Sequence, residues 1–184
     1  LIRLQNSDGS LLCILTLAGG SPPSSSTDPS YYGPATTNAT LMGAAAFAYA
    51  SKIFGARPEA DMKSFAEDLR TRALSAWAWA EANPNVLYYN NDDSKQPGSG
   101  GLGAGQQETD DNGRRFSKFQ AAMYLYEITG EARFKDFVES NYSNIVSESG
   151  PNCWEMEQQE AVLYYTELDG ISSNVRSAIL TKFL

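Results

Sequence analysis

Three short segments of the chain share one pattern, and this pattern constrains the fold more than any other feature. They read KIFGARPEAD (52–61), EITGEARFKD (127–136) and ELDGISSNVR (167–176), and each places a glycine between two stretches of helical apolar periodicity. Glycine is favoured where a helix ends, so Gly55, Gly130 and Gly170 predict three tight turns between consecutive helices. The chain is therefore expected to form three helical hairpins.

The apolar periodicity predicts helices over about residues 37–54, 58–82, 114–128, 131–146, 155–168 and 173–183. Thr36 or Thr37 is expected to cap the first helix, and Pro58 to begin the second. Trp77 falls on the apolar stripe of the second helix, which predicts a core position for it. No stretch alternates convincingly with period two, so no strand is predicted. Residues 1–35 are expected to hold the end of a helix and then a long loop.

The connections are short within each pair of helices and long between pairs, as in residues 84–112. This alternation is typical of an all-α fold, either an α/α toroid or an α-solenoid. In a toroid the long loops gather at one end and line a substrate cleft, which places these residues on one rim: Tyr31, Tyr32, Tyr88, Tyr89, Asp110, Asp111 and Trp154. Three hairpins do not close a toroid, so the face of the helices that points to its centre is expected to stay open. The residues expected on this inner face are Phe47, Phe119, Met123 and Val162.

Composition excludes several classes of function. The net charge is -8 and the longest basic cluster is Arg114-Arg115, so nucleic acid is not expected as a partner. No apolar run reaches the roughly 18 residues of a membrane span, and no membrane partner is expected. Histidine is absent, which removes Ser-His-Asp catalysis and His-based metal sites, and neither a cofactor nor a metal site is predicted. Cys13 and Cys153 are too far apart for a CxxC motif, and both a disulfide and two reduced thiols remain open.

Three features of the expected rim have two readings each. Tyr31 and Tyr32 offer flat aromatic faces on which a sugar ring can stack, or they pack within their own loop. Asp110 and Asp111 either cap the following helix or contact a sugar hydroxyl or a cation. Trp154, next to a helix start, is either a sugar platform or a hydrophobic staple.

Five segments together resemble glycoside hydrolase family 9, a family of cellulases (endo-1,4-β-glucanases) with an (α/α)6 barrel. They are LQNSDGSLL (4–12), SPPSSSTDPSYYGPATTNAT (21–40), AAAFAYASKIF (44–54), ANPNVL (82–87) and AAMYLYEITGEARFKDF (121–137). The resemblance implies that residues 1–184 form part of one such barrel, with about three of its six hairpins. Residues 1–35 would be the end of a lead-in helix and a cleft loop, and residues 36–184 the hairpins.

The resemblance also implies an inverting glycosidase in which an Asp activates water and a Glu protonates the leaving oxygen. Neither motif of the family that carries these acids occurs in the chain, so no catalytic residue is assigned. The family's aromatic-His pair is replaced by Leu11-Leu12-Cys13. By resemblance, the substrate-binding residues are Tyr31, Tyr32, Asp111 and Trp154.

The partners that the resemblance implies are a β-glucan or oligosaccharide substrate and the rest of the parent barrel. The parent protein would be secreted or periplasmic. The isolated chain is expected to be inactive, because the catalytic acid and base lie outside it. The alternative from another class is a non-catalytic α/α module that binds glycan or protein.

Overall fold

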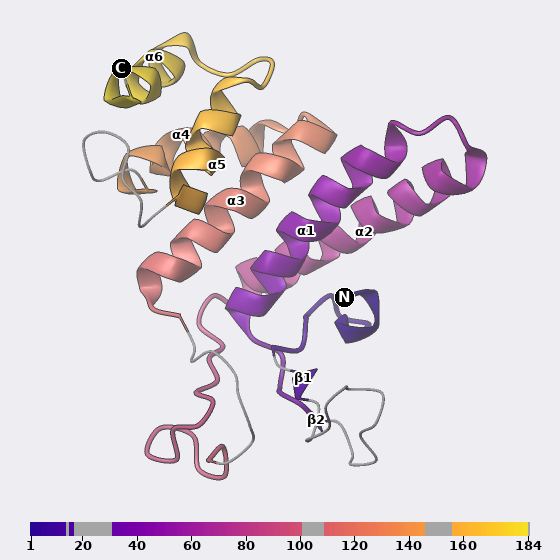
Figure 1. The fold of residues 1–184 in the computed structure, drawn as a ribbon, viewed down its shortest axis with the longest axis vertical. Helices are drawn as coiled ribbons and strands as arrows, with labels where there is room; N and C mark the ends of the chain where they lie inside the picture. The colour runs from indigo at the N-terminus through magenta and orange to yellow at the C-terminus, as the bar shows by residue number, and fades with distance from the viewer. Residues whose placement is uncertain (14, 17–30, 101–108, 146–155, 184) are drawn as a thin grey trace.

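The computed structural model describes residues 1–13, 15–16, 31–100, 109–145 and 156–183. Within these residues the chain is all-α, as the sequence predicts, apart from two very short strands that the sequence analysis does not predict (Figure 1). A 3-10 helix, Ile2–Leu4, is followed by β1 (Leu15–Thr16) and β2 (Tyr31–Tyr32). The α-helices are α1 (Thr37–Gly55), α2 (Ala60–Ala82), α3 (Asp111–Thr129), α4 (Ala132–Ile145), α5 (Met156–Thr166) and α6 (Ser173–Phe183).

The helices pair as the three predicted hairpins, α1 with α2, α3 with α4 and α5 with α6. The first and second hairpins join mainly through α1 and α3, whereas α5 of the third hairpin contacts both α3 and α4. Figure 1 shows the resulting order across the molecule, from α2 and α1 through α3 to α5 and α6. This arrangement matches part of an α/α toroid and confirms the predicted fold class.

Small side chains let the first hairpin close tightly. Ala44 and Ala48 of α1 and Ala73 and Ala76 of α2 have no exposed surface, so the two helix backbones can approach closely. The Ser51 hydroxyl donates a hydrogen bond to the Ala66 carbonyl across the hairpin, at 2.8 Å. Helix α1 begins where the sequence predicts, because the Thr36 hydroxyl accepts a hydrogen bond from the Ala39 N–H.

The three hairpin glycines differ in conformation. Gly130 and Gly170 have φ of +69° and +72°, the left-handed region that favours glycine at a helix end. Gly55 is the last residue of α1 and is itself helical; the cap is Ala56, also right-handed. The prediction that all three glycines stop a helix in the same way was therefore wrong for Gly55. The second helix also begins later than predicted, at Ala60 and not at Pro58.

The N-terminal part differs most from the prediction. Leu1–Leu4 forms a single 3-10 turn and not the end of an α-helix. Tyr31 and Tyr32 lie in β2, which pairs antiparallel with β1 so that Leu15 opposes Tyr32. Strands of two residues are too short to show alternation in a sequence, which is why the loop prediction missed them. Leu11 anchors this region on α1, where its N–H donates to Thr40 Oγ1 at 2.9 Å.

The core lies between the helices and includes Trp77, as predicted. The Trp77 ring is 3% exposed and meets Phe134 and Phe137 of α4 edge-on, with ring centroids 5.3 and 5.8 Å away. The Trp77 indole N–H has no hydrogen-bond partner among the described residues, and Lys118 Nζ lies 5.1 Å from the ring centroid. This aromatic cluster joins the first hairpin to the second.

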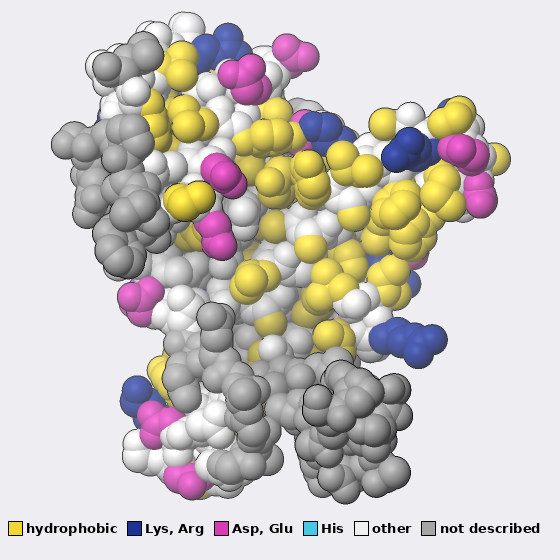
Figure 2. Space-filling view, viewed as in Figure 1, with side chains coloured by type: hydrophobic (Ala, Val, Ile, Leu, Met, Phe, Trp, Pro, Cys, Tyr) yellow, Lys and Arg dark blue, Asp and Glu magenta, His cyan; other side chains and the backbone are white. Residues whose placement is uncertain are grey.

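The predicted open inner face was assigned to the wrong residues. At most 2% of Phe47, Phe119, Met123 or Val162 is exposed, so all four belong to the core. One side of α1 is open instead, and we call it the α1 stripe: Met42, Ala46, Tyr49 and Ile53, all exposed. Their spacing of three or four residues puts them on one side of the helix. Figure 2 shows apolar side chains gathered over the α1 region on this view of the molecule.

Among the helices that the structure describes, none has the length and apolar character needed to cross a bilayer.

Candidate functional site

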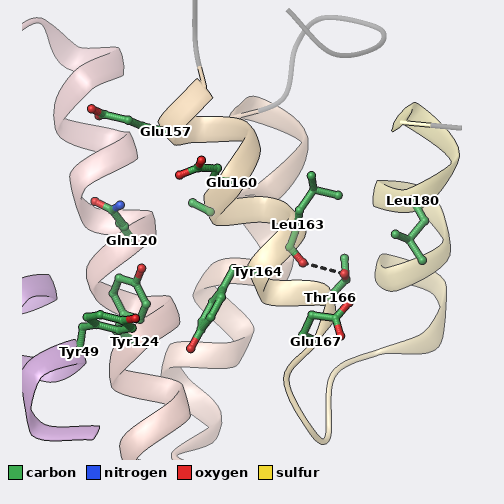
Figure 3. A pocket seen from close by; sticks show the side chains of 11 residues that line it. Tyr49, Gln120, Tyr124, Glu157, Glu160, Leu163, Tyr164, Thr166, Glu167 and Leu180 are labelled. Carbon is green, nitrogen blue, oxygen red and sulfur yellow. Dashed lines mark hydrogen bonds between the residues drawn. The ribbon is translucent and has the colours of Figure 1, made fainter. Parts of the chain in front are cut away.

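A row of tyrosines crosses the three helices α1, α3 and α5. Tyr49 of α1 and Tyr124 of α3 have ring centroids 5.0 Å apart, and Tyr124 and Tyr164 of α5 lie 5.6 Å apart. Tilted and edge-on aromatic contacts at such distances are favourable. Each hairpin thus contributes one ring to a shared aromatic surface (Figure 3).

The same positions recur in the internal repeat. Each tyrosine of the row stands six residues before the glycine of its own hairpin, in YASKIFG (49–55), YLYEITG (124–130) and YYTELDG (164–170). A charged residue follows three positions after each tyrosine: Lys52, Glu127 and Glu167. Residues three apart lie on the same side of a helix, so each repeat presents an aromatic and a charged group together.

Two of these charged residues bind each other beside the row. Lys52 Nζ lies 2.5 Å from Glu127 Oε1, and the Tyr164 hydroxyl donates to the Glu127 carboxylate at 2.8 Å. The hydrogen bond to Glu127, and then that to Tyr164, raises the pKa of Lys52, while burial raises the pKa of Tyr164. Lysine therefore stays charged and tyrosine neutral over the physiological range. The network ties α1, α3 and α5 together through polar contacts.

The tyrosine row forms one wall of a pocket of about 510 Å³, which we call the tyrosine pocket. Gln120 of α3 and Glu157 and Glu160 of α5 point toward the space between their helices (Figure 3). Aromatic faces with carboxylate and amide groups suit a sugar, because rings stack on apolar sugar faces and oxygens accept from hydroxyls. Both glutamates are exposed. A glycosidase acid, by contrast, usually lies in an apolar environment that keeps it protonated.

Of the two tyrosines predicted to bind substrate, Tyr31 and Tyr32, only Tyr32 has a side chain that the structure describes. It is 60% exposed and lines a mainly apolar pocket of about 670 Å³ with Ile2, Phe54 and Phe65. The side chain of Tyr31 lies outside the described part. Figure 1 shows β2 and residues 83–100 at the end of the helical array where α1 and α3 begin. The two segments thus share an end of the molecule, as the rim prediction requires.

The two aspartates have different positions. Asp110 caps α3, where its carboxylate accepts a hydrogen bond from the Gly113 N–H at 2.8 Å, so the capping reading is confirmed for this residue. Asp111 lies in the first turn of α3 and forms an ion pair with Arg114. It lines a third pocket, described below, that includes neither Tyr32 nor the tyrosine row. The structure therefore does not bring Tyr32 and Asp111 into one pocket.

Several predictions concern residues that the structure does not describe. Trp154 and Cys153 are among them, so the platform role of Trp154 and the pairing of Cys153 stay predictions. Cys13 is partly buried. Over the described ranges, no three acidic or cysteine side chains converge as they would around a metal ion.

The three consecutive helical hairpins, packed side by side, define the chain as part of an α/α toroid. The chain belongs to glycosyl hydrolase family 9, whose family model matches residues 20–182. This confirms the resemblance seen in the five sequence segments.

Individual relatives agree with the family. A cellulose 1,4-beta-cellobiosidase from Acetivibrio thermocellus is 30% identical over 135 residues, which cover 72% of this chain and 14% of that protein. A metagenome-derived family 9 endoglucanase is similar in structure, with a TM-score of 0.77, 24% identity and 99% of this chain covered. A family 9 protein from Bacteroides ovatus gives a TM-score of 0.73 at 23% identity, with 97% of this chain covered. At these identities the structural matches show the fold, and the chain spans 32% of the length of each solved chain.

Proposed function

We propose that this chain is the middle part of a catalytic domain that cleaves β-1,4-glucan with inversion at the anomeric carbon. The observation that carries the proposal is the family match over residues 20–182. An inverting glycosidase needs a carboxylic acid and a carboxylate roughly 6.5–9.5 Å apart, with a water molecule between the base and the sugar. We assign both groups to parts of the domain outside this chain.

The role proposed for this chain is to build one side of the glucan cleft. The α1–α2 and α3–α4 hairpins form a rigid support, and residues at the end where α1 and α3 begin contact the sugar. Tyr31, Tyr32 and Trp154 are proposed as stacking surfaces, and Asp111 as an acceptor for a sugar hydroxyl. A polymeric glucan does not enter cells intact, so the parent protein is proposed to act outside the cytoplasm.

Hydrolysis by the purified chain tests the assignment of the catalytic pair. We expect no release of reducing ends from carboxymethyl cellulose, because the chain supplies neither the acid nor the base. The matched variants are Asp110→Asn and Asp111→Asn, which keep side-chain size and remove the charge. Release that persists through purification and disappears in either variant would place the catalytic pair within this chain and contradict the proposal.

Binding of neutral cello-oligosaccharides tests the cleft role. Calorimetric titration should show that Tyr32→Ala weakens binding by about 0.5–1.5 kcal/mol, the contribution of one aromatic contact. Tyr32→Phe keeps the ring and should bind nearly as well as the original chain. Equal affinity in all three proteins would remove Tyr32 from the cleft. Binding by a full-length parent that releases no reducing ends would favour the alternative, a non-catalytic glycan-binding module.

A further inference from the structure

The pocket that Asp111 lines has the opposite charge to the chain as a whole. It lies between the start of α1, the end of α2 and the start of α3, and it measures about 260 Å³. Its charged side chains are Arg114, Arg115, Lys118 and Asp111, so cations outnumber anions three to one in a chain of net charge -8. We call it the cationic pocket. Such a local excess of positive charge attracts an anionic group.

Two of the three cations are already held by neighbours. The Arg114 side chain contacts the Asp111 carboxylate and donates to the Thr109 carbonyl at 2.7 Å. Lys118 Nζ lies 3.2 Å from Glu81 Oε1 and also faces the Trp77 ring. These contacts hold the Arg114 and Lys118 side chains in place, and both side chains still line the pocket.

Arg115 differs from both. Its one hydrogen bond within the described residues goes to Asn112 Oδ1 at 3.5 Å, the outer limit for such a bond, and it makes no ion pair there. The guanidinium group can therefore bind a ligand with the loss of at most this one long hydrogen bond. Guanidinium matches a carboxylate with two parallel hydrogen bonds, which gives both affinity and orientation.

The rest of the pocket suits a sugar ring more than a bare ion. Leu41, Ala80 and Pro84 supply an apolar wall. The Asn85 side chain lines the pocket and makes no hydrogen bond within the described part of the chain. An amide both donates to and accepts from hydroxyl groups. The pocket thus combines a cation for a carboxylate, an amide for hydroxyls and an apolar surface for a ring.

From this combination we propose that the cationic pocket binds a uronic acid residue carried on a glycan chain, with the sugar carboxylate on Arg115. The inference rests on the proposed function in one respect, namely that the ligand belongs to a glycan. It extends that function, because a plain β-glucan carries no carboxylate. The substrate class would then be an acid-substituted β-glycan.

The experiment compares binding of a glucuronate-bearing oligosaccharide with binding of the neutral oligosaccharide of the same length. Calorimetric titration at low salt should show about tenfold tighter binding of the acidic compound, because a hydrogen-bonded charge pair contributes on this scale. Arg115→Gln should abolish the preference, so that the variant binds the acidic and the neutral compound with equal affinity. Arg133→Gln, which removes an exposed arginine of α4 that pairs with Glu131, is the matched control and should keep the preference.

Inorganic phosphate and free glucuronic acid separate charge from sugar recognition. Glucuronic acid should compete with the acidic oligosaccharide, and Asn85→Ala should weaken this competition. Phosphate should compete poorly; equal competition would overturn the assignment to a sugar acid. A preference that survives in Arg115→Gln, or equal affinity for both oligosaccharides, would also overturn it. Uronate binding without any binding of neutral glucan would support this site while contradicting the proposed function.

Discussion

Tyr165 is a fully buried ionisable residue, and its burial has a consequence at high pH. No part of the side chain is exposed, and its hydroxyl lies 3.3 Å from Glu139 Oε1. Burial, and then the nearby Glu139 carboxylate, raises the pKa of Tyr165 well above its ordinary value. Ionisation of this side chain therefore favours the unfolded chain, where its pKa is close to 10.

The free energy of unfolding should accordingly fall as the pH rises above about 10. The stabilisation is complete below the pKa of the unfolded state and is lost as the pH approaches the higher folded-state pKa. One tyrosine accounts for at most about 1.4 kcal/mol per pH unit. Urea unfolding at a series of pH values between neutral and alkaline measures the slope.

Tyr165→Phe is the control for this pH dependence. It should lower stability at neutral pH by about 1 kcal/mol, because the hydroxyl contact with Glu139 is lost. Its alkaline slope should be shallower than that of the original chain. It should not vanish, because the pKa values of Tyr124 and Tyr164 are raised too. Parallel slopes in the two proteins would show that Tyr165 does not titrate with unfolding.

The candidate site was only partly predictable at the level of single residues. Tyr32 and Asp111 were chosen for chemistry and position near helix starts, and such reasoning cannot tell that they line separate pockets. Tyr49, Tyr124 and Tyr164 were missed because each lies inside a helix, where a tyrosine is usually a packing residue. Their signal was the register of the repeat, six residues before each glycine. Arg115 was noted only as part of the Arg114-Arg115 pair, because its lack of an ion pair among the described residues is visible only in the structure.

At the level of helices, the prediction was best where periodicity was strong. Helix α6 matches its predicted bounds, and α1 extends one residue further than expected. The start of α3 was placed too late, because Asp110 acts as the cap and brings Asp111, Asn112 and Gly113 into the helix. The residues of the pattern Asp-Asp-Asn-Gly have low helix propensity, which favours a later helix start. The cap formed by Asp110 outweighed this low propensity.

The three hairpin glycines provide a test at this scale. Gly55→Ala should raise the free energy of unfolding by about 0.4–1 kcal/mol, because the residue is helical and the added Cβ meets Ala66 Cβ at an ordinary 3.6 Å. Gly130→Ala should lower it by about 1–2 kcal/mol, the cost of a left-handed conformation for alanine. Chemical unfolding of the two variants measures both changes.

Gly170→Ala should be the most destabilising of the three. It has the same left-handed conformation as Gly130, and its added Cβ would lie 2.7 Å from the Tyr126 hydroxyl. That hydroxyl donates to the Asp169 carbonyl at 2.9 Å, so it has to move and lose this bond. Equal effects of all three alanines would mean that the hairpin turns are alike after all.

For the molecule as a whole, the exposed α1 stripe predicts association of the isolated chain. Met42 and Ile53 are 56% and 41% exposed, and they lie on the same side of α1. Exposed apolar patches promote association in water. The double variant Met42→Lys with Ile53→Lys should reduce light scattering during thermal unfolding, with little change in the transition temperature.

Met156→Lys is the matched control for the stripe. Met156 is 58% exposed but stands at the start of α5, away from α1. Its replacement should leave scattering unchanged. A monodisperse monomer with a sharp, reversible transition in the original chain would contradict the expectation of association.

Trp77 gives the molecule an optical reporter of its own assembly. Its indole is almost fully buried between α2 and α4, and within the described part of the chain its ring nitrogen has no hydrogen-bond partner. Its fluorescence should therefore be emitted at short wavelength in the folded chain. When α4 separates from α2, water reaches the indole and the emission shifts to longer wavelength. Replacing Trp79 and Trp154 by phenylalanine would leave this one emitter. The emission wavelength of Trp77 would then report, in real time, whether the second hairpin is packed on the first.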